Sequence, residues 1–400
     1  MQIKRIEVRV PSSKSLSNRW LILNEVLGGV FEIENPSSSD DTALLQSHLH
    51  SIRTSSCSTF DCKNAGTVAR FLTAYLSVKQ GSYIITGSSR LKQRPIKPLV
   101  EALQTLGAEI HYLEEKDCLP IKIVGKNLKG CEVDVLADKS SQFVTALMLI
   151  APVLDNGLRI NIQGDVVSEP YIAMTAKVLE QVGMIVERID NTIKVLKNNV
   201  KPQRVIIEGD WSSASYFYNW VLLSDNVEVV IKGLALGCSL QGDSIVSELY
   251  KTLGVNTLAM DEDSVLLTKT AADTKDFTHN FKTTPDLVPT LAVGCAAMGI
   301  NACFTGLGSL AYKETDRIKA LALELGKMNK TVMSTADTLI IKSAPQLSIT
   351  APVSTYNDHR MAMAFAPLVL INKGLEIDDK AVVEKSFPDY WEQIEPFLYC

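Results

Sequence analysis

The 400-residue sequence repeats one pattern six times. In each copy, a segment rich in Ser, Asn and Asp opens an apolar helix, the helix ends at Gly or Asn, and a short alternating strand follows. The turns after the helices fall at Gly29, Gly81, Gly157, Asn226, Gly299 and Gly374. Gly and Asn tolerate the left-handed backbone that commonly follows a helix. This recurrence indicates a repeat architecture, with six units grouped as two domains of three.

Two kinds of helix alternate within the repeat. The six helices above are apolar on nearly all sides, which predicts that they are buried. Helices with a single apolar face are predicted in residues 98–110, 174–186, 245–257 and 318–332. Each unit is therefore predicted to contain an interior helix, an exterior helix and short strands, which makes the fold α/β. The stretch 41–63 is too short for a complete unit and predicts a trimmed copy.

The composition limits the class of protein. A hydrophobic content of 46% excludes a disordered chain, and a net charge of −5 argues against a nucleic-acid partner. The longest apolar stretch, residues 143–154, is interrupted and too short to cross a membrane. Eight cysteines are scattered without metal-ligand spacing, which predicts reduced thiols in the cytoplasm and no metal site. No isolated apolar surface stripe stands out, so a monomer is expected.

Cations occur at the starts of the predicted buried helices. The hydroxyl residues there can be simple N-caps, but capping does not explain Lys14, Arg19, Arg70 or Arg360. Cations are unfavourable both at the positive end of a helix dipole and in a buried helix. A bound anion would remove both objections, because backbone N–H groups and cations together bind oxyanions. The pattern predicts a pocket for a small molecule with several negative charges.

Two further basic segments are consistent with such a pocket. Residues 90–97 carry Arg94 among other cations, although a solvated loop is an alternative interpretation. Lys313 and Arg317 are four residues apart and are predicted to share one helical face, where surface ion pairs are the alternative. The sequence contains no Walker-type loop, no Gly-x-Gly-x-x-Gly and no Gly-x-Ser-x-Gly. A nucleotide cofactor is therefore not expected.

The motifs together resemble one family, the 5-enolpyruvylshikimate-3-phosphate synthases, which are enolpyruvyl transferases. They run in family order from residue 11 to 390: PSSKSLSNR, SSDDT, NAGTVARF, RLKQRPIKPLVEALQTLGA, SSQFVTAL, SEPYIAMT, EGDWSSASYF, PDLVPTLAV, YKETDRI, NDHRMAMAFA and SFPDY. The resemblance implies two inside-out α/β barrel domains, each of three βαβαββ units with buried helices and outer sheets. The expected domains are 13–208, and 1–12 plus 209–400, closing on ligand around an active site in the cleft between them.

The implied activity is that of a 3-phosphoshikimate 1-carboxyvinyltransferase of the shikimate pathway, which serves aromatic amino-acid biosynthesis. The enolpyruvyl group of phosphoenolpyruvate passes to the 5-hydroxyl of shikimate 3-phosphate by addition and elimination, phosphate leaves, and neither a cofactor nor a metal is needed. The resemblance assigns these residues to phosphoenolpyruvate: Lys14, Gly66, Arg94, Gln142, Arg317, Arg360 and Lys385. It assigns these to shikimate 3-phosphate: Lys14, Ser15, Arg19, Ser140, Ser141, Gln142, Ser168, Tyr171, Asp286 and Lys313.

The resemblance also implies the proton-transfer groups. Asp286 is expected to take the proton of the 5-hydroxyl, and Glu314 to exchange the proton at the methylene carbon, with Lys14 as a partner acid. Two positions depart from the family pattern. Phe71 stands where Pro is usual, which bears on phosphoenolpyruvate affinity and inhibitor response, and Ser309 stands where many members have an Asn that contacts the shikimate phosphate.

Two alternatives remain open at this point. The related UDP-N-acetylglucosamine enolpyruvyl transferases carry a catalytic Cys in a longer loop, whereas residues 86–94 contain no Cys. A catalytically dead anion-binding relative would lack a proton-transfer residue, whereas Asp286, Glu314 and Lys14 are all present.

Overall fold

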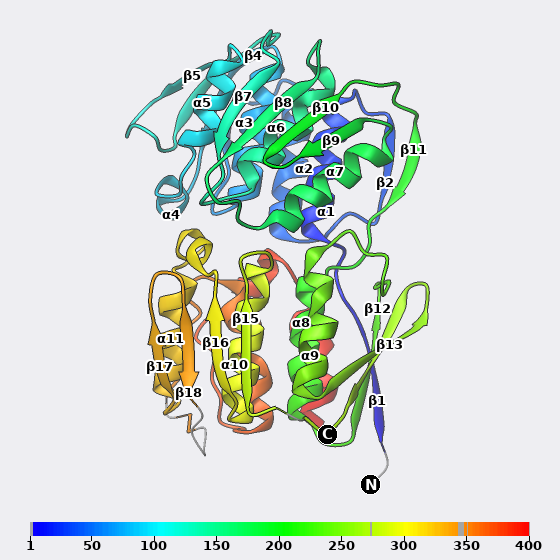
Figure 1. The fold of residues 1–400 in the computed structure, drawn as a ribbon, viewed down its shortest axis with the longest axis vertical. Coiled ribbons are helices and arrows are strands. Elements are labelled where there is room, and N and C mark those ends of the chain that lie inside the picture. Colours follow the sequence, from blue (N-terminus) through cyan, green and yellow to red (C-terminus); the bar gives the residue numbers. More distant parts are fainter. Residues whose placement is uncertain (1–2, 273, 343–347, 350, 400) are drawn as a thin grey trace. The chain divides into compact units, whose positions relative to one another are not determined.

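The computed structural model describes residues 3–272, 274–342, 348–349 and 351–399 (Figure 1). The chain divides into two compact units. The N-terminal unit comprises Lys14–Ser37 and Asp41–Ile207, and the C-terminal unit comprises Met1–Ser13, Ser38–Asp40 and Glu208–Cys400. Each unit is built from the repeat that the sequence predicts.

The N-terminal unit contains two complete βαβαββ repeats in its described residues. The first consists of β3 (Thr59–Asp61), α3 (Gly66–Val78), β4 (Gly81–Thr86), α5 (Lys97–Thr105), β5 (Glu109–Tyr112) and β6 (Ile121–Gly125), with a short α4 (Ser89–Lys92) before α5. The second consists of β7 (Glu132–Leu136), α6 (Gln142–Ile150), β8 (Leu158–Gln163), α7 (Glu169–Gln181), β9 (Ile185–Ile189) and β10 (Thr192–Leu196). The strand orders are β3-β4-β6-β5 and β7-β8-β10-β9, so both repeats have the same topology.

The described part of the C-terminal unit repeats this topology twice. One repeat consists of α8 (Trp211–Leu223), β12 (Val227–Lys232), α9 (Val246–Leu253), β13 (Val255–Asp261) and β14 (Ser264–Lys269), and its first strand is the distant β1 (Lys4–Arg9). The other consists of β15 (Asp276–Asn280), α10 (Val288–Met298), β16 (Asn301–Thr305), α11 (Arg317–Lys327), β17 (Thr331–Ser334) and β18 (Leu339–Lys342). The strand β1 pairs in parallel with β12, from Lys4 opposite Val227 to Arg9 opposite Lys232.

The remaining repeat of each unit is shortened. In the N-terminal unit it consists of α1 (Lys14–Val26), β2 (Phe31–Glu34) and α2 (Asp40–Arg53), with β11 (Gln203–Ile206) parallel to β2. This shortening agrees with the trimmed copy predicted around residues 41–63. In the C-terminal unit, α12 (His359–Phe365) is followed by a 3₁₀ turn, and the predicted sixth strand is reduced to an isolated bridge between Val353 and Ile377.

The chain turns at all six predicted positions, and at five of them the turn residue has a positive φ. Gly29, Gly81, Gly157, Asn226 and Gly299 all have positive φ, as expected after a helix. Gly374, in contrast, does not have a positive φ. Here the backbone N–H of Gly374 donates to Asn372 Oδ1 at 2.9 Å, and such a side-chain turn does not require a left-handed residue.

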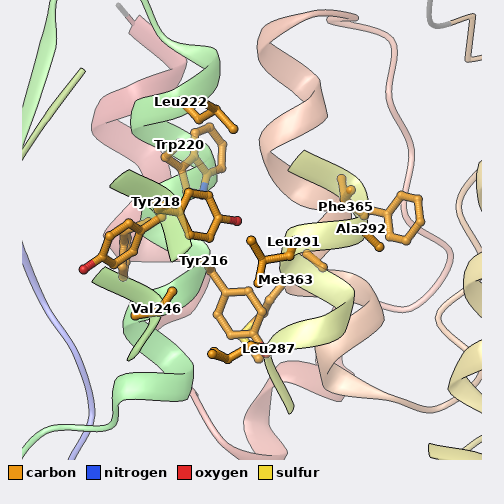
Figure 2. Close-up of a cluster of buried hydrophobic side chains, with 14 of the residues drawn as sticks. Tyr216, Tyr218, Trp220, Leu222, Val246, Leu287, Leu291, Ala292, Met363 and Phe365 are labelled. Atoms are coloured by element: carbon orange, nitrogen blue, oxygen red, sulfur yellow. The ribbon is translucent and has the colours of Figure 1, made fainter. Parts of the chain in front are cut away.

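The predicted division into interior and exterior helices is confirmed except at α1, which was predicted to be buried on nearly all sides but is only half-buried at both of its ends. Nearly every residue of α3, α6, α8 and α10 is buried, whereas α5, α7, α9 and α11 bury one face. In the C-terminal unit, Figure 2 shows side chains of α8 and α10 packed with Met363 and Phe365 of α12. The strands β7 and β8 alternate between buried and exposed residues, so their sheet presents one face to solvent.

Two further observations concern the thiols and the helices. The cysteines that the structure describes, at 57, 62, 118, 131, 238, 295 and 303, are free thiols, and Cys400 lies outside the described residues. Among the residues with described structure, none of the helices is both long enough and apolar enough to span a bilayer.

Candidate active site

The site residues predicted from the sequence fall into two clusters, one in each unit. The N-terminal cluster comprises Lys14, Ser15, Arg19, Gly66, Arg94, Ser140, Ser141, Gln142, Ser168 and Tyr171. The C-terminal cluster comprises Asp286, Lys313, Glu314, Arg317, Arg360 and Lys385. Most members of both clusters lie at or next to helix N-termini, where backbone N–H groups are available to an anion, whereas Arg19 lies in the second turn of α1 and Lys385 ends a 3₁₀ helix.

Arg317 is the centre of the C-terminal cluster. Its side chain is buried, with only 2% of its surface exposed. Its Nη1 donates to Asp286 Oδ1 at 2.9 Å, and its Nη2 donates to Glu314 Oε2 at 2.9 Å. Its Nε donates to Asp358 Oδ2 at 2.7 Å. Burial alone would lower the pKa of Arg317, but the three carboxylates outweigh burial and raise it, so Arg317 remains charged.

Asp286 joins the other cations of the cluster to Arg317. Arg360 Nη2 donates to Asp286 Oδ2 at 2.8 Å, and Lys313 Nζ lies 3.4 Å from Asp286 Oδ1. Burial alone would raise the pKa of Asp286, but Arg360, Lys313 and Arg317 hold that pKa well below its usual range. Asp286 is therefore ionised at neutral pH and can act as a proton acceptor. Burial lowers the pKa of Lys313, with Asp286 opposing the shift.

Helix caps fix the positions of the two arginines. Asp358 precedes α12, and its Oδ1 accepts from the backbone N–H of Arg360 at 3.0 Å. Asp316 caps α11 in the same way, through the backbone N–H of Lys319 at 3.3 Å. The predicted helical face shared by Lys313 and Arg317 is wrong, because α11 begins at Arg317 and Lys313 is in extended backbone. The Asp316 cap starts the helix later than the residue spacing indicated.

In the N-terminal cluster, Arg19 links α1 to α7. Its Nε donates to Thr175 Oγ1 at 2.9 Å, and its Nη2 donates to the backbone carbonyl of Tyr171 at 3.1 Å. The guanidinium carbon lies 5.7 Å from the ring centroids of both Phe71 and Tyr171. Burial lowers the pKa of Arg19 to about 10, so the side chain is still protonated at neutral pH.

Gly66, at the start of α3, is surrounded by guanidinium groups. A Cβ atom at this position would lie 2.5 Å from Arg70 Nη1 and 2.6 Å from Arg94 Nη2, so a larger residue would displace them. Arg70 Nη1 donates to the backbone carbonyl of Gly66 at 3.0 Å, and Arg94 Nη1 donates to that of Asn64 at 3.5 Å. The absence of a side chain at Gly66 therefore lets two cations approach the first turn of α3.

The other members of the N-terminal cluster connect the neighbouring helix starts. Gln142, the first residue of α6, donates from Nε2 to Thr67 Oγ1 of α3 at 3.0 Å, and Ser140 Oγ accepts from its backbone N–H at 3.2 Å. Lys14 Nζ lies 3.2 Å from Asp41 Oδ2. Ser168 precedes α7 with a left-handed backbone, at φ 57°. Contacts between α1, α3, α6 and α7 bring these helix starts together within the unit.

Sequence reasoning did not assign a site role to several residues that hold the clusters. One of them is Asp358, whose Oδ2 accepts a hydrogen bond from Arg317 Nε. Asp41 pairs with Lys14, and the hydroxyl of Tyr216 accepts a hydrogen bond from Arg360 Nη1 at 3.2 Å. Asp41, Tyr216 and Asp358 all lie inside motifs that carried the resemblance, which was the available signal. Ser309 is buried next to this region, on the segment that precedes Lys313.

Comparison with known proteins gives a consistent result. The family model for EPSP synthase (3-phosphoshikimate 1-carboxyvinyltransferase) matches residues 45–394. A 3-phosphoshikimate 1-carboxyvinyltransferase of Bacteroides fragilis is 38% identical over 390 residues, which covers 97% of this chain and 94% of that protein. The enzyme of the same name from Vibrio campbellii is 34% identical over 414 residues, which covers 97% and 96%.

Solved structures give the same fold. An EPSP synthase from Acinetobacter baumannii has a TM-score of 0.76 at 20% sequence identity and covers 99% of this chain and 96% of that one. The family match, the full-length relatives and the two clusters of charged residues agree: this chain belongs to the EPSP synthase family.

Proposed function

We propose that this protein is a 3-phosphoshikimate 1-carboxyvinyltransferase, which transfers the enolpyruvyl group of phosphoenolpyruvate to the 5-hydroxyl of shikimate 3-phosphate. The observation that carries the proposal is the bonding of Asp286 and Glu314 to the same buried Arg317, beside Lys313, Arg360 and Lys385. Carboxylates that can move protons thus lie among cations that can bind anions. This combination fits a reaction between two phosphorylated acids.

Phosphoenolpyruvate carries a carboxylate and a phosphate, which suit bidentate guanidinium groups. We assign these residues to it: Lys14, Gly66, Arg94, Gln142, Arg317, Arg360 and Lys385. Arg360 and Lys385 are tied to the proton-transfer carboxylates Asp286 and Glu314, at 2.8 Å and 3.7 Å, so a bound phosphoenolpyruvate would lie close to both. The guanidinium groups around Gly66 supply a second anion site.

Shikimate 3-phosphate is assigned mainly to the helix starts of the N-terminal unit. We assign these residues to it: Lys14, Ser15, Arg19, Ser140, Ser141, Gln142, Ser168 and Tyr171, with Asp286 and Lys313 from the C-terminal unit. Arg19 carries a buried charge that its hydroxyl and carbonyl partners do not neutralise. A ligand phosphate would neutralise it. On this proposal both units contribute to one reaction.

The chemistry requires three proton transfers. In the addition step, Asp286 removes the proton of the 5-hydroxyl, and the hydroxyl oxygen bonds to C2 of phosphoenolpyruvate. At the same time C3 of phosphoenolpyruvate gains a proton. In the elimination step, C3 loses a proton, the double bond reforms and phosphate leaves. Glu314 exchanges the proton at C3, with Lys14 as partner acid. Arg360, Lys313 and Arg317 outweigh burial and hold the pKa of Asp286 low, which keeps the carboxylate ionised and able to accept a proton but makes it a weak base.

The test is phosphate release measured with both substrates. The purified protein should release one phosphate for each shikimate 3-phosphate consumed, and should release none when UDP-N-acetylglucosamine replaces it. Release with UDP-N-acetylglucosamine would favour the related transferase. Binding of both substrates without release would identify a catalytically dead relative. We also propose that the protein is a monomer, which sedimentation of the purified protein tests, and that it is cytoplasmic, which fractionation of cells tests.

A further inference from the structure

The segment that leads into Arg360 has an unusual backbone. Tyr356 and Asn357 both have φ of 55°, in the left-handed region that a large side chain such as Tyr rarely adopts. The next residue, Asp358, caps α12 and binds Arg317, and Arg360 follows two positions later. The positions of Asp358 and Arg360 therefore depend on a backbone conformation that Asn357 tolerates but Tyr356 does not favour.

Glu324 holds this segment from the neighbouring helix α11. Its side chain has no exposed surface. The hydroxyl of Tyr356 donates to Glu324 Oε1 at 2.6 Å, and the backbone N–H of Ser354 donates to Oε2 at 3.1 Å. Lys327 Nζ lies 2.8 Å from Oε1 and balances the buried charge. One carboxylate thus bonds the residues on both sides of Thr355.

Further bonds carry the restraint toward the site. Asp378 Oδ1 accepts a hydrogen bond from the backbone N–H of Thr355 at 2.9 Å. The backbone carbonyl of Thr355 in turn accepts a hydrogen bond from the backbone N–H of Asp358 at 2.9 Å. Glu324 also lies seven residues after Arg317, on the same buried face of α11. One helix therefore carries Arg317 directly and positions Asp358 and Arg360 through Glu324.

We propose that Glu324 is a positioning residue for phosphoenolpyruvate binding, which holds the left-handed Tyr356–Asn357 turn and thereby sets Arg360 relative to Arg317. The inference rests on the proposed function for the identity of the ligand. It assigns Glu324 no contact with substrate. Asp286 keeps Arg317 and Lys313 as partners if Arg360 moves, so the effect falls on phosphoenolpyruvate and spares shikimate 3-phosphate.

Tyr356→Phe is the sharpest variant, because it removes one hydroxyl from the tether and leaves the Glu324–Lys327 pair intact. We expect KM for phosphoenolpyruvate to rise roughly tenfold, as for the loss of a charge-assisted hydrogen bond, with a smaller change in kcat. KM for shikimate 3-phosphate should change less than twofold. Glu324→Gln should act in the same direction, because Tyr356 and Ser354 donate to different carboxylate oxygens and one of these becomes an NH2 donor in the amide. Equal rises in both KM values would overturn the proposal.

Tyr218→Phe is the matched control. Its hydroxyl lies 2.9 Å from Thr257 Oγ1 in the core of the same unit, so the variant also loses one tyrosine hydrogen bond. This control should leave both KM values unchanged, even where thermal stability falls as much as in Tyr356→Phe. A similar rise in KM for phosphoenolpyruvate in the control would mean that general loosening of the unit is responsible.

Hydrogen exchange measured by mass spectrometry tests the restraint without substrate. Peptides covering residues 353–361 should exchange faster in Tyr356→Phe and Glu324→Gln than in the wild-type protein or in Tyr218→Phe. Unchanged exchange in both tether variants would overturn the proposal. If the wild-type protein released no phosphate from its two substrates, the proposed function would fail, whereas faster exchange would still establish Glu324 as the residue that holds the turn.

Discussion

Two buried arginines, one in each unit, are held in opposite ways. Arg317, in the C-terminal unit, donates to the carboxylates of Asp286, Glu314 and Asp358. Arg19, in the N-terminal unit, donates to a hydroxyl and to the backbone carbonyls of Ser15 and Tyr171. The carboxylates raise the pKa of Arg317, whereas burial lowers that of Arg19 to about 10. Both arginine side chains are almost inaccessible to solvent, but of the two only Arg317 has its charge balanced by carboxylates of the protein.

This difference separates two uses of a buried cation. Arg317 and the carboxylates that it binds hold one another in position by charge-assisted hydrogen bonds. The arginine therefore orients carboxylates that can transfer protons. Around Arg19, the cation is positioned by neutral groups and its charge remains available to a ligand phosphate. The substitutions below test this distinction, because each should affect turnover, substrate affinity or stability in a different proportion.

Glu314→Gln should have the largest effect. The amide can still accept a hydrogen bond from Arg317 but cannot exchange a proton, so kcat should fall about 100-fold to 10,000-fold, as for loss of a general acid or base. Binding of both substrates, measured by calorimetry, should change little. Near-normal turnover would remove Glu314 from the mechanism and leave Asp286 as the proton-transfer carboxylate.

Arg317→Met and Arg19→Met should differ in stability. Removing Arg317 leaves buried carboxylates without their shared counter-ion and should lower the free energy of unfolding by about 3–5 kcal/mol. Removing Arg19 loses hydrogen bonds but also relieves the burial of a charge, so the loss should be under about 2 kcal/mol. Urea unfolding measures both. Equal losses would contradict the distinction drawn between these arginines.

Arg19→Met should also weaken shikimate 3-phosphate binding selectively. A charge-assisted contact between a buried guanidinium and a phosphate is strong, and its loss should raise KM for this substrate by roughly 100-fold. KM for phosphoenolpyruvate should rise far less. Steady-state kinetics with each substrate varied in turn provide the measurement, and a uniform rise in both constants would argue against the assignment of Arg19.

The local features of this fold were predictable from the sequence. The buried helices follow from their lack of a polar face, and the left-handed turns after them follow from Gly and Asn at residues such as Gly157 and Asn226. Gly374 was the exception, because glycine permits a left-handed backbone without requiring it. The cations at helix starts were identified from the same sequence signals and from the family motifs.

The pairings within the clusters were not predictable in the same way. Arg317 and Asp358 are 41 positions apart, and Arg360 and Tyr216 are 144 apart, so nothing in the local pattern connects them. Tyr216 in particular sits in a helix with no polar face, where an aromatic residue is expected for packing alone. Only the packing of α8, α10 and α12 brings that hydroxyl to a guanidinium.

Asp243 should make stability depend on pH. Burial, and then the charge of Asp286, raise the pKa of Asp243 from 3.8 to about 7, and Ser212 donates to its carboxylate. Between about pH 4 and 7 the folded protein therefore holds a proton that the unfolded chain has released, so this group's contribution to stability falls as pH rises.

The corresponding substitution is Asp243→Asn, which removes the ionisation and keeps an acceptor for Ser212. At pH 8 the variant should be more stable than the wild-type protein by an amount on the order of 1–3 kcal/mol, and the difference should vanish near pH 4. Thermal unfolding followed from pH 4 to 8 gives the comparison. A difference that stays constant with pH would exclude titration of Asp243 as its origin.

Phe71→Leu should have the smallest effect. It tests most directly whether uncharged neighbours position the Arg19 side chain. The Arg19 guanidinium carbon is 5.7 Å from the Phe71 ring centroid, and leucine keeps most of the apolar volume but has no aromatic face. KM for shikimate 3-phosphate should rise about threefold to fivefold, which corresponds to roughly 1 kcal/mol. Phe143→Leu is the matched control, because it removes the ring 5.9 Å from the Arg70 guanidinium carbon and should leave this KM unchanged. If both substitutions raise KM for shikimate 3-phosphate equally, the rings act through packing of the helices, and the aromatic contact does not set the position of Arg19.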